Sequence, residues 1–243
     1  MENFKKSLED FERALELIPD SIAKGLKVVK PEDLEGGALY HISTNTKITK
    51  FVPCVSRRTM DGEDRSVPRI CVSPTITGCM LGYGAIYADF HAWDNKKNKG
   101  INNALWQIYD IPFKLAIRPA KKLLPDQRDT DEHWLITYNR ETREYVPRKI
   151  GMLKMVGYKS GYLKGELIDE LTIAAKVEAG EKVLFHSGVL LEPGTWLLKI
   201  KNWKVQNRNT ALTVSVEPID SKTHDDYVKE RISMESKPFS ASW

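Results

Sequence analysis

Short runs of β-forming residues, separated by polar loops rich in glycine and proline, constrain the fold of this chain more than any other feature. Three runs read "ALYHIS" from residue 38, "RICVSP" from residue 69 and "EHWLITY" from residue 132. Two more, "KVLFHSGVLLEPGTWLLKIKNWKVQ" and "ALTVSVEPI", lie in the C-terminal third. Branched and aromatic residues in short runs that stop at turn residues are typical of strands. We therefore expect an α+β fold with mostly antiparallel or mixed sheets.

Apolar residues spaced three and four apart predict an amphipathic helix at the N-terminus, ending at Pro19. This helix either packs on the domain or binds a partner. Its apolar stripe consists of Phe4, Leu8, Phe11, Leu15 and Ile18.

Two further segments have helix start signals. Thr75 or Thr77 is placed to cap a helix in "TITGCMLGYGAIYADF", although its glycines weaken that prediction. Asp220 or Ser221 is placed to cap a last helix in "KTHDDYVKERISM". The stretch "RKIGMLKMVGYKSGYLKGEL" predicts short strand pieces broken by glycine.

Composition indicates how the chain is divided. Its 243 residues, 41% hydrophobic and 29% charged, suffice for one large domain or two modest ones. The pattern becomes more β-rich near residue 157. We predict an N-terminal helix and linker over 1–37, a core over 38–156 and a β-rich part with the terminal helix over 157–243.

Charge and cysteine content limit the compartment and the partners. A net charge of +4 permits contact with nucleic acid or an acidic partner without requiring it. The odd set of Cys54, Cys71 and Cys79 lacks metal-binding spacing and predicts free thiols in a reducing compartment. Without an apolar leader or membrane span, we expect a cytoplasmic protein with no membrane contact.

Most chemical motifs are missing. The sequence has no P-loop, GxSxG, HExxH or EF-hand loop, and its histidines form no close pair. His91 and Asp94 are read as loop residues rather than ligands, so no metal is predicted. Cys71 would be a nucleophile only with a histidine folded beside it, and a buried inert thiol is the alternative.

Three residues at strand ends form the most informative pattern. His41 lies near the exit of the first run, Ser73 ends the second, and Glu132 begins the third. This order resembles the ADP-ribosyltransferase superfamily, in its poly(ADP-ribose)-polymerase and diphtheria-toxin branch. There, a first strand carries Leu-(Trp/Tyr)-His-Gly, a second strand precedes a helix, and a later strand opens with a catalytic glutamate. The sequence differs by Ile42 in place of the glycine and Cys71 in place of a tyrosine. "YHIS" followed by "PRICVSP" also resembles bacterial and bacteriophage segments without assigned activity.

The resemblance implies NAD as substrate, with Glu132 stabilising positive charge on the nicotinamide ribose. It implies His41 as a ribose contact and an unidentified macromolecular target, either a host protein or nucleic acid. Arg69 is preferred to Arg57 or Arg58 for the pyrophosphate because it adjoins the second strand. The remaining candidate contacts are Tyr40, Tyr83 and Tyr87 for ring stacking, with Ser43 and Ser73 as polar contacts.

Other interpretations remain open. His41 is equally a core histidine bonded to a carbonyl, and Glu132 a solvated residue before a strand. A basic strand face could bind nucleic acid through stacking and phosphate contacts, and its residues are Lys199, Lys201, Trp203, Lys204 and Arg208. A third class is a virus-type inhibitor that covers a host protein.

Overall fold

The computed structural model describes residues 24–55, 61–82, 105–137, 143–163, 166–204 and 210–229, together with residues 9 and 22. The predicted N-terminal helix, which ends at Pro19, lies outside these residues except for residue 9. Tyr83, Tyr87, Arg57, Arg58 and Arg208 also lie outside them.

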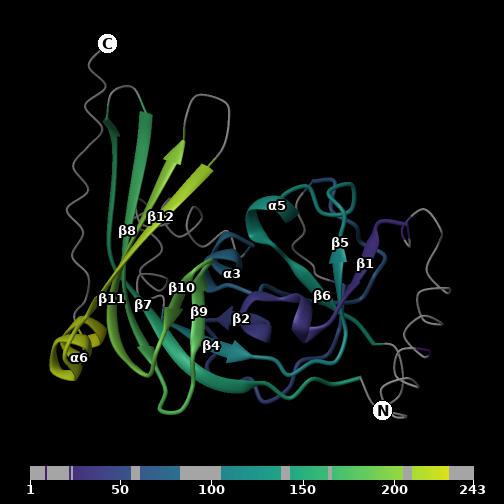
Figure 1. The fold of residues 1–243 in the computed structure, drawn as a ribbon, viewed down its shortest axis with the longest axis horizontal. Helices are drawn as coiled ribbons and strands as arrows, with labels where there is room; N and C mark the ends of the chain where they lie inside the picture. The colour runs from purple at the N-terminus through teal and green to yellow at the C-terminus, as the bar shows by residue number, and fades with distance from the viewer. Residues whose placement is uncertain are drawn as a thin grey trace, which may run out of the picture.

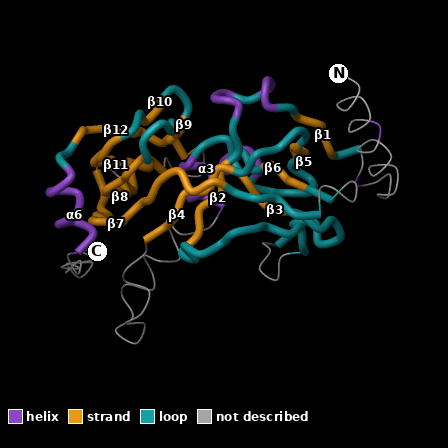
Figure 2. The backbone as a smooth tube through the Cα atoms, turned by 90° about the horizontal axis from the view of Figure 1, so that it is seen from below, coloured by secondary structure: helices purple, strands orange, loops and turns teal. Residues whose placement is uncertain are grey.

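A six-stranded antiparallel sheet forms the larger half of the molecule (Figures 1 and 2), in the order β12-β11-β8-β7-β4-β2. Its long hairpins project beyond the rest of the fold in Figure 1. Its strands are β2 (Tyr40–Ser43), β4 (Leu105–Asp110), β7 (Arg148–Leu163), β8 (Glu166–Val177), β11 (Gly194–Lys204) and β12 (Thr210–Pro218).

A four-stranded antiparallel sheet of short strands forms the other half, in the order β1-β5-β6-β3. A small hairpin, β9–β10, packs beside helix α3. The mostly antiparallel α+β class predicted from the sequence is confirmed. The strands of the small sheet and of the hairpin are β1 (Leu26–Val29), β3 (Ile70–Val72), β5 (Ala116–Pro119), β6 (His133–Leu135), β9 (Val183–His186) and β10 (Val189–Leu191).

The helices of the described part are short, and two predicted caps are confirmed. Thr75 Oγ1 accepts from the Gly78 N–H at 3.1 Å, and Asp220 Oδ1 accepts from the Thr223 N–H at 2.8 Å. No helix in the described part is long and apolar enough to cross a membrane. The helices are α3 (Ile76–Gly82), α5 (Gln127–Thr130) and α6 (Ser221–Lys229), with 3₁₀ turns η1 (Pro31–Asp33) and η2 (Glu35–Gly37).

Strand β7 differs from the prediction of short, glycine-broken pieces, because it is continuous over 16 residues. A Cβ on Gly151 would lie 2.3 Å from the Lys176 carbonyl oxygen of β8, so glycine permits the close approach of the two strands. Gly157 adjoins a register shift. The predicted boundary at 156/157 lies inside β7, and the large sheet includes strands from both sides of it.

Three clusters of buried apolar residues hold the fold. One lies against the large sheet and includes Tyr40, Ile42 and α3. The other two lie on opposite faces of the small sheet, because successive strand residues alternate in direction. Trp134 packs on one face together with Cys71, and Val72 packs on the other.

Candidate functional site

The three strands that the sequence singled out are neighbours in space. Cys71 of β3 lies opposite Trp134 of β6. Tyr40 of β2 and Ser73 exchange two backbone hydrogen bonds, of 2.8 and 3.0 Å. Helix α3 follows β3, and Glu132 immediately precedes β6. The segments therefore converge in the order β2, β3, β6.

Strands β2 and β3 pair at one bridge, Tyr40–Ser73, and form no further ladder pair within their described residues. Beyond that point β2 continues beside β4 and β3 beside β6. The carbonyl of Cys71 lies at this divergence and bonds His41 Nδ1 at 3.0 Å instead of a strand partner. An imidazole thus replaces a backbone donor where the two strands separate.

The His41 ring is half-buried and packs edge-on against Phe51, with 4.8 Å between ring centroids. Phe51 in turn packs edge-on against Tyr109 at 5.7 Å. Burial lowers the pKa of His41 despite the bond to Cys71, so the ring is neutral near pH 7. Because a carbonyl only accepts, Nδ1 carries the hydrogen and Nε2 is the acceptor.

Glu132 lies half-buried on the other side of Cys71, toward Trp134 and α3. Its Oε1 accepts the Trp134 indole N–H at 2.8 Å, and the Cys71 thiol also bonds the carboxylate. A Cβ on Gly82, at the end of α3, would lie 3.6 Å from Oε2. Burial raises the pKa of Glu132, although both hydrogen bonds oppose the shift.

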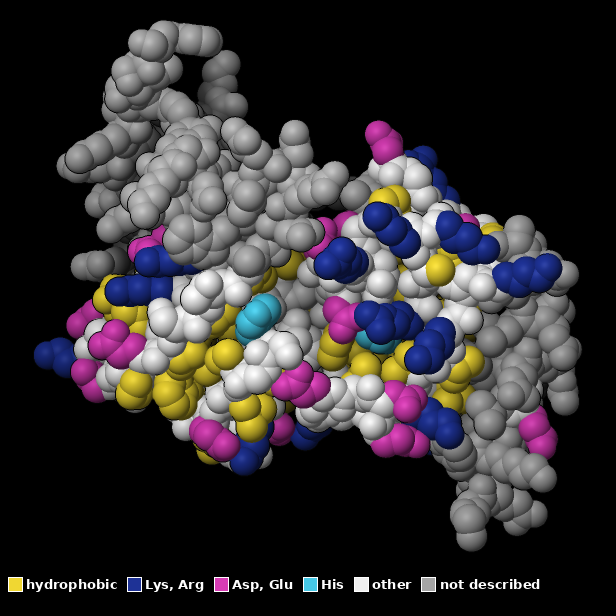
Figure 3. Space-filling model, turned by 45° about the horizontal axis from the view of Figure 1, so that its top comes forward, with side chains coloured by type: hydrophobic (Ala, Val, Ile, Leu, Met, Phe, Trp, Pro, Cys, Tyr) yellow, Lys and Arg dark blue, Asp and Glu magenta, His cyan; other side chains and the backbone are white. Residues whose placement is uncertain are grey.

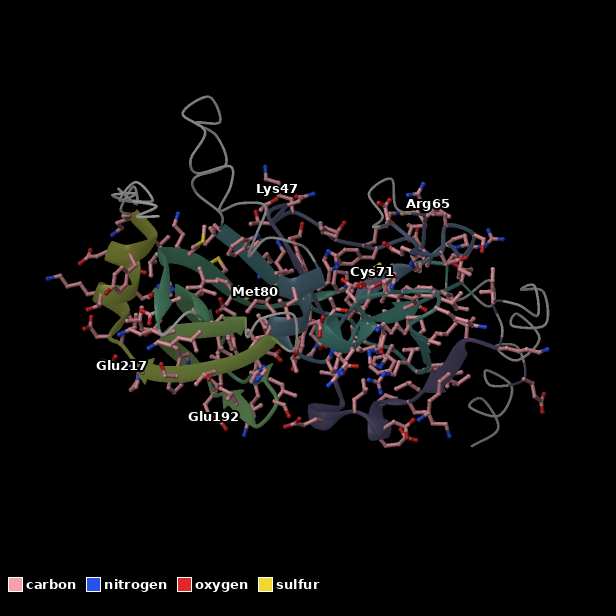
Figure 4. All side chains as sticks on the ribbon, turned by 90° about the horizontal axis from the view of Figure 1, so that it is seen from above. Lys47, Arg65, Cys71, Met80, Glu192 and Glu217 are labelled. Atoms are coloured by element: carbon pink, nitrogen blue, oxygen red, sulfur yellow. The ribbon has the colours of Figure 1, made fainter. Side chains whose placement is uncertain are left out.

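The Cys71 thiol is a neutral donor rather than a nucleophile. Burial raises its pKa, and the neighbouring Glu132 carboxylate raises it further. Figure 4 labels Cys71 near the middle of the view, and its side chain is partly buried. The interpretation as a buried, inert thiol therefore fits this position.

Asp131 turns the chain into β6 and was not identified from the sequence. Its backbone is left-handed, with φ of 44°, and its N–H closes α5 by bonding the Gln127 carbonyl at 2.9 Å. Aspartate tolerates this conformation better than most residues. In the sequence, this turn is marked only by the pair Asp131-Glu132 just before a strand. The turn at Asp131 directs the Glu132 side chain inward.

His41 and Glu132 both contact Cys71, but on different sides of β3. The carboxylate meets the thiol on the face of Trp134. The imidazole meets the carbonyl and packs against Phe51, which belongs to the cluster on the opposite face. The two residues are thus brought to one strand, with Cys71 between them.

The environment of Arg69 argues against its predicted contact with a pyrophosphate. Its side chain is 0% exposed, bonds Glu63 through Nη2, and lies 4.2 Å from the centroid of the Trp134 ring. Nη1 donates to the Val67 carbonyl at 2.9 Å. Arg69 was chosen because it adjoins the second strand. That same position buries its side chain.

The three other predicted contacts that the structure describes have internal partners. Tyr40 is buried, and its hydroxyl accepts from the Leu184 N–H at 3.2 Å, which argues against stacking on a ligand. Ser73 is buried and donates to the Thr130 carbonyl at 3.0 Å. Ser43 is half-buried and accepts from the Asn45 N–H at 3.1 Å.

The basic strand face is only partly described. Lys199 is exposed, but Lys201 Nζ lies 3.2 Å from Glu170 Oε2 on the neighbouring strand. Trp203 and Lys204 belong to β11, and their side chains are outside the described part. Lys201 is therefore partly neutralised.

Comparisons with protein-family models, curated proteins and solved structures found no match to this chain. Among the described residues, no three His, Cys, Asp or Glu side chains gather in a way that could hold a metal ion. The only guide to the chemistry of the site is therefore the set of residues that form it.

Proposed function

We propose that the protein uses NAD as a substrate, either transferring ADP-ribose to a macromolecular target or hydrolysing the nicotinamide bond. One observation carries this proposal. Three strands far apart in sequence meet side by side, the second is followed by a helix, and a half-buried carboxylate, Glu132, opens the third. The order of these elements along the chain is the one on which the sequence resemblance rests.

Glu132 supplies the chemistry in this proposal. The bond between nicotinamide and C1′ of the ribose breaks, its electron pair leaves with nicotinamide, and positive charge develops on the sugar. The ionised carboxylate stabilises that charge. A hydroxyl of the target, or water, bonds to C1′ and passes its proton to the carboxylate. The bonds from Trp134 and Cys71 hold the carboxylate in one orientation.

In this proposal, NAD binds where β2 diverges from β3. In the proposal, His41, which is half-buried at this divergence, accepts from a ribose hydroxyl through Nε2.

The test is turnover of NAD labelled on the adenylate, in the presence of cell extract. We expect label transfer or nicotinamide release by the wild type. Glu132→Gln should lose at least about 2 orders of magnitude in rate, and His41→Ala should lose less. Glu217→Gln, on the exposed strand β12, is the matched control. Absence of turnover by the wild type, together with no NAD binding by calorimetry, would refute the proposal.

A further inference from the structure

Strands β1 and β5 carry an unusual concentration of positive charge. Residues 24–30 and 114–122, which contain these strands, include no aspartate or glutamate, although the whole chain has 33 acidic residues against 37 basic ones. Figure 3 shows Lys and Arg side chains gathered over this half of the molecule. The basic residues of the two segments are Lys24, Lys27, Lys30, Lys114, Arg118, Lys121 and Lys122.

Five of these residues, which we name the β1–β5 basic surface, lie close together and are exposed. The Ala120 N–H donates to the Gly25 carbonyl at 2.6 Å and joins the ends of the two segments. Lys122 Cε lies 2.7 Å from where a Cβ on Gly25 would be, so its stem crosses the chain next to Lys24. The five residues are Lys24, Lys27, Arg118, Lys121 and Lys122.

Lys27 and Arg118 lie directly opposite each other across the β1–β5 pair. Like charges in directly opposed positions destabilise a sheet. Arg118 bonds Asp131 at 2.8 Å through one of its nitrogens, and its side chain remains 46% exposed. Asp131 thus offsets the charge of Arg118. The arrangement costs stability in the free protein, and an anion bound over it would relieve the cost.

We infer that the β1–β5 basic surface binds nucleic acid through its phosphates. Regularly spaced phosphates suit several cations on an exposed strand pair, and binding would release condensed counterions. This surface differs from the β11 face proposed from the sequence, where Lys201 is already paired with Glu170. The inference does not depend on catalysis by Glu132, because none of the five cations contacts that carboxylate in the described contacts.

The test is fluorescence anisotropy of the full chain with a labelled oligonucleotide of mixed sequence, single-stranded and duplex, over a salt series. The double variant Lys27→Ala, Lys121→Ala should bind about tenfold more weakly at low salt, and its salt slope should fall by about 2. The matched control is Lys222→Ala with Lys229→Ala, which removes two exposed lysines of α6 and should bind as the wild type.

A second variant separates a binding role from a structural one. Lys27→Glu should raise the melting temperature, because it replaces a like-charge pair with an opposite one, and should weaken oligonucleotide binding. Three results would overturn the inference: no salt-dependent binding by the wild type, equal binding by the double variant, or equally tight binding of polyglutamate. The last result would identify an acidic protein segment as the partner. Glu132→Gln should bind as the wild type, so loss of NAD turnover leaves this result unaffected.

Discussion

The two sheets of this protein differ in the length of their strands and in the residues that they bury. The large sheet joins long strands in continuous ladders, with up to 16 residues in one strand, over an apolar core. The small sheet has strands of three or four residues and buries Arg69, Ser73 and His133 near Glu132. Buried polar groups cost stability unless each has a partner.

The large sheet also buries polar residues, namely Gln107, Asp110 and Lys154, so the sheets differ mainly in strand length and apolar burial, which favour the large sheet for stability. In the proposal, the reacting carboxylate of Glu132 adjoins the small sheet and His41 belongs to β2 of the large one.

Removing an ion pair from each half should give the largest contrast. Arg69→Ala removes a fully buried cation that bonds the Glu63 carboxylate, which is only 10% exposed, and should cost about 3–5 kcal/mol of unfolding free energy. Arg148→Ala also uncovers a carboxylate that is 10% exposed, that of Asp110, but the guanidinium it removes is 57% exposed and water can take its place, so the cost should be lower, about 1–2 kcal/mol. Urea denaturation measures both. Equal costs would contradict this difference between the two ion pairs.

Replacing one fully buried tryptophan in each half should give a smaller contrast. Trp134 donates to Glu132, whereas the Trp106 indole N–H of β4 has no acceptor among the described residues. Trp134→Phe should therefore cost about 1–2 kcal/mol more than Trp106→Phe, because it removes a hydrogen bond to a charged group. Thermal unfolding of both variants at pH 7 measures the difference. A larger cost at Trp106 would show that the bond to Glu132 adds little.

Neutralising Glu132 should have the smallest effect, and it should be stabilising. Since burial raises the pKa of this carboxyl, the folded state binds its proton more tightly than the unfolded state. The contribution of Glu132 to stability is fully present below the ordinary carboxyl pKa and is lost as the pH rises through the raised one. Glu132→Gln should be about 1 kcal/mol more stable than the wild type at pH 7.

The pH dependence checks the sign of that prediction. The stability gain of Glu132→Gln should shrink as the pH falls below the raised pKa of the wild-type carboxyl. Glu217→Gln, at an exposed position, should show no such trend. A variant that is less stable than the wild type at pH 7 would mean that the carboxylate holds the site together rather than straining it.

Local patterns predicted strand positions and two helix caps, because branched residues, turns and caps act over a few neighbouring residues. They did not predict the continuity of β7, which depends on the approach of the Lys176 carbonyl to Gly151. They did not predict the burial of Arg69 beneath Trp134, nor the side of β3 on which His41 lies. These features depend on register between strands distant in sequence, which a single sequence does not specify.

The most direct test compares nicotinamide release from NAD by the purified wild type and by Glu132→Gln, side by side. We predict that the wild type releases nicotinamide, that this release falls at low pH because the pKa of Glu132 is raised, and that the folded variant loses it. Release at equal rates by both proteins would contradict the assignment of Glu132 as the reacting carboxylate.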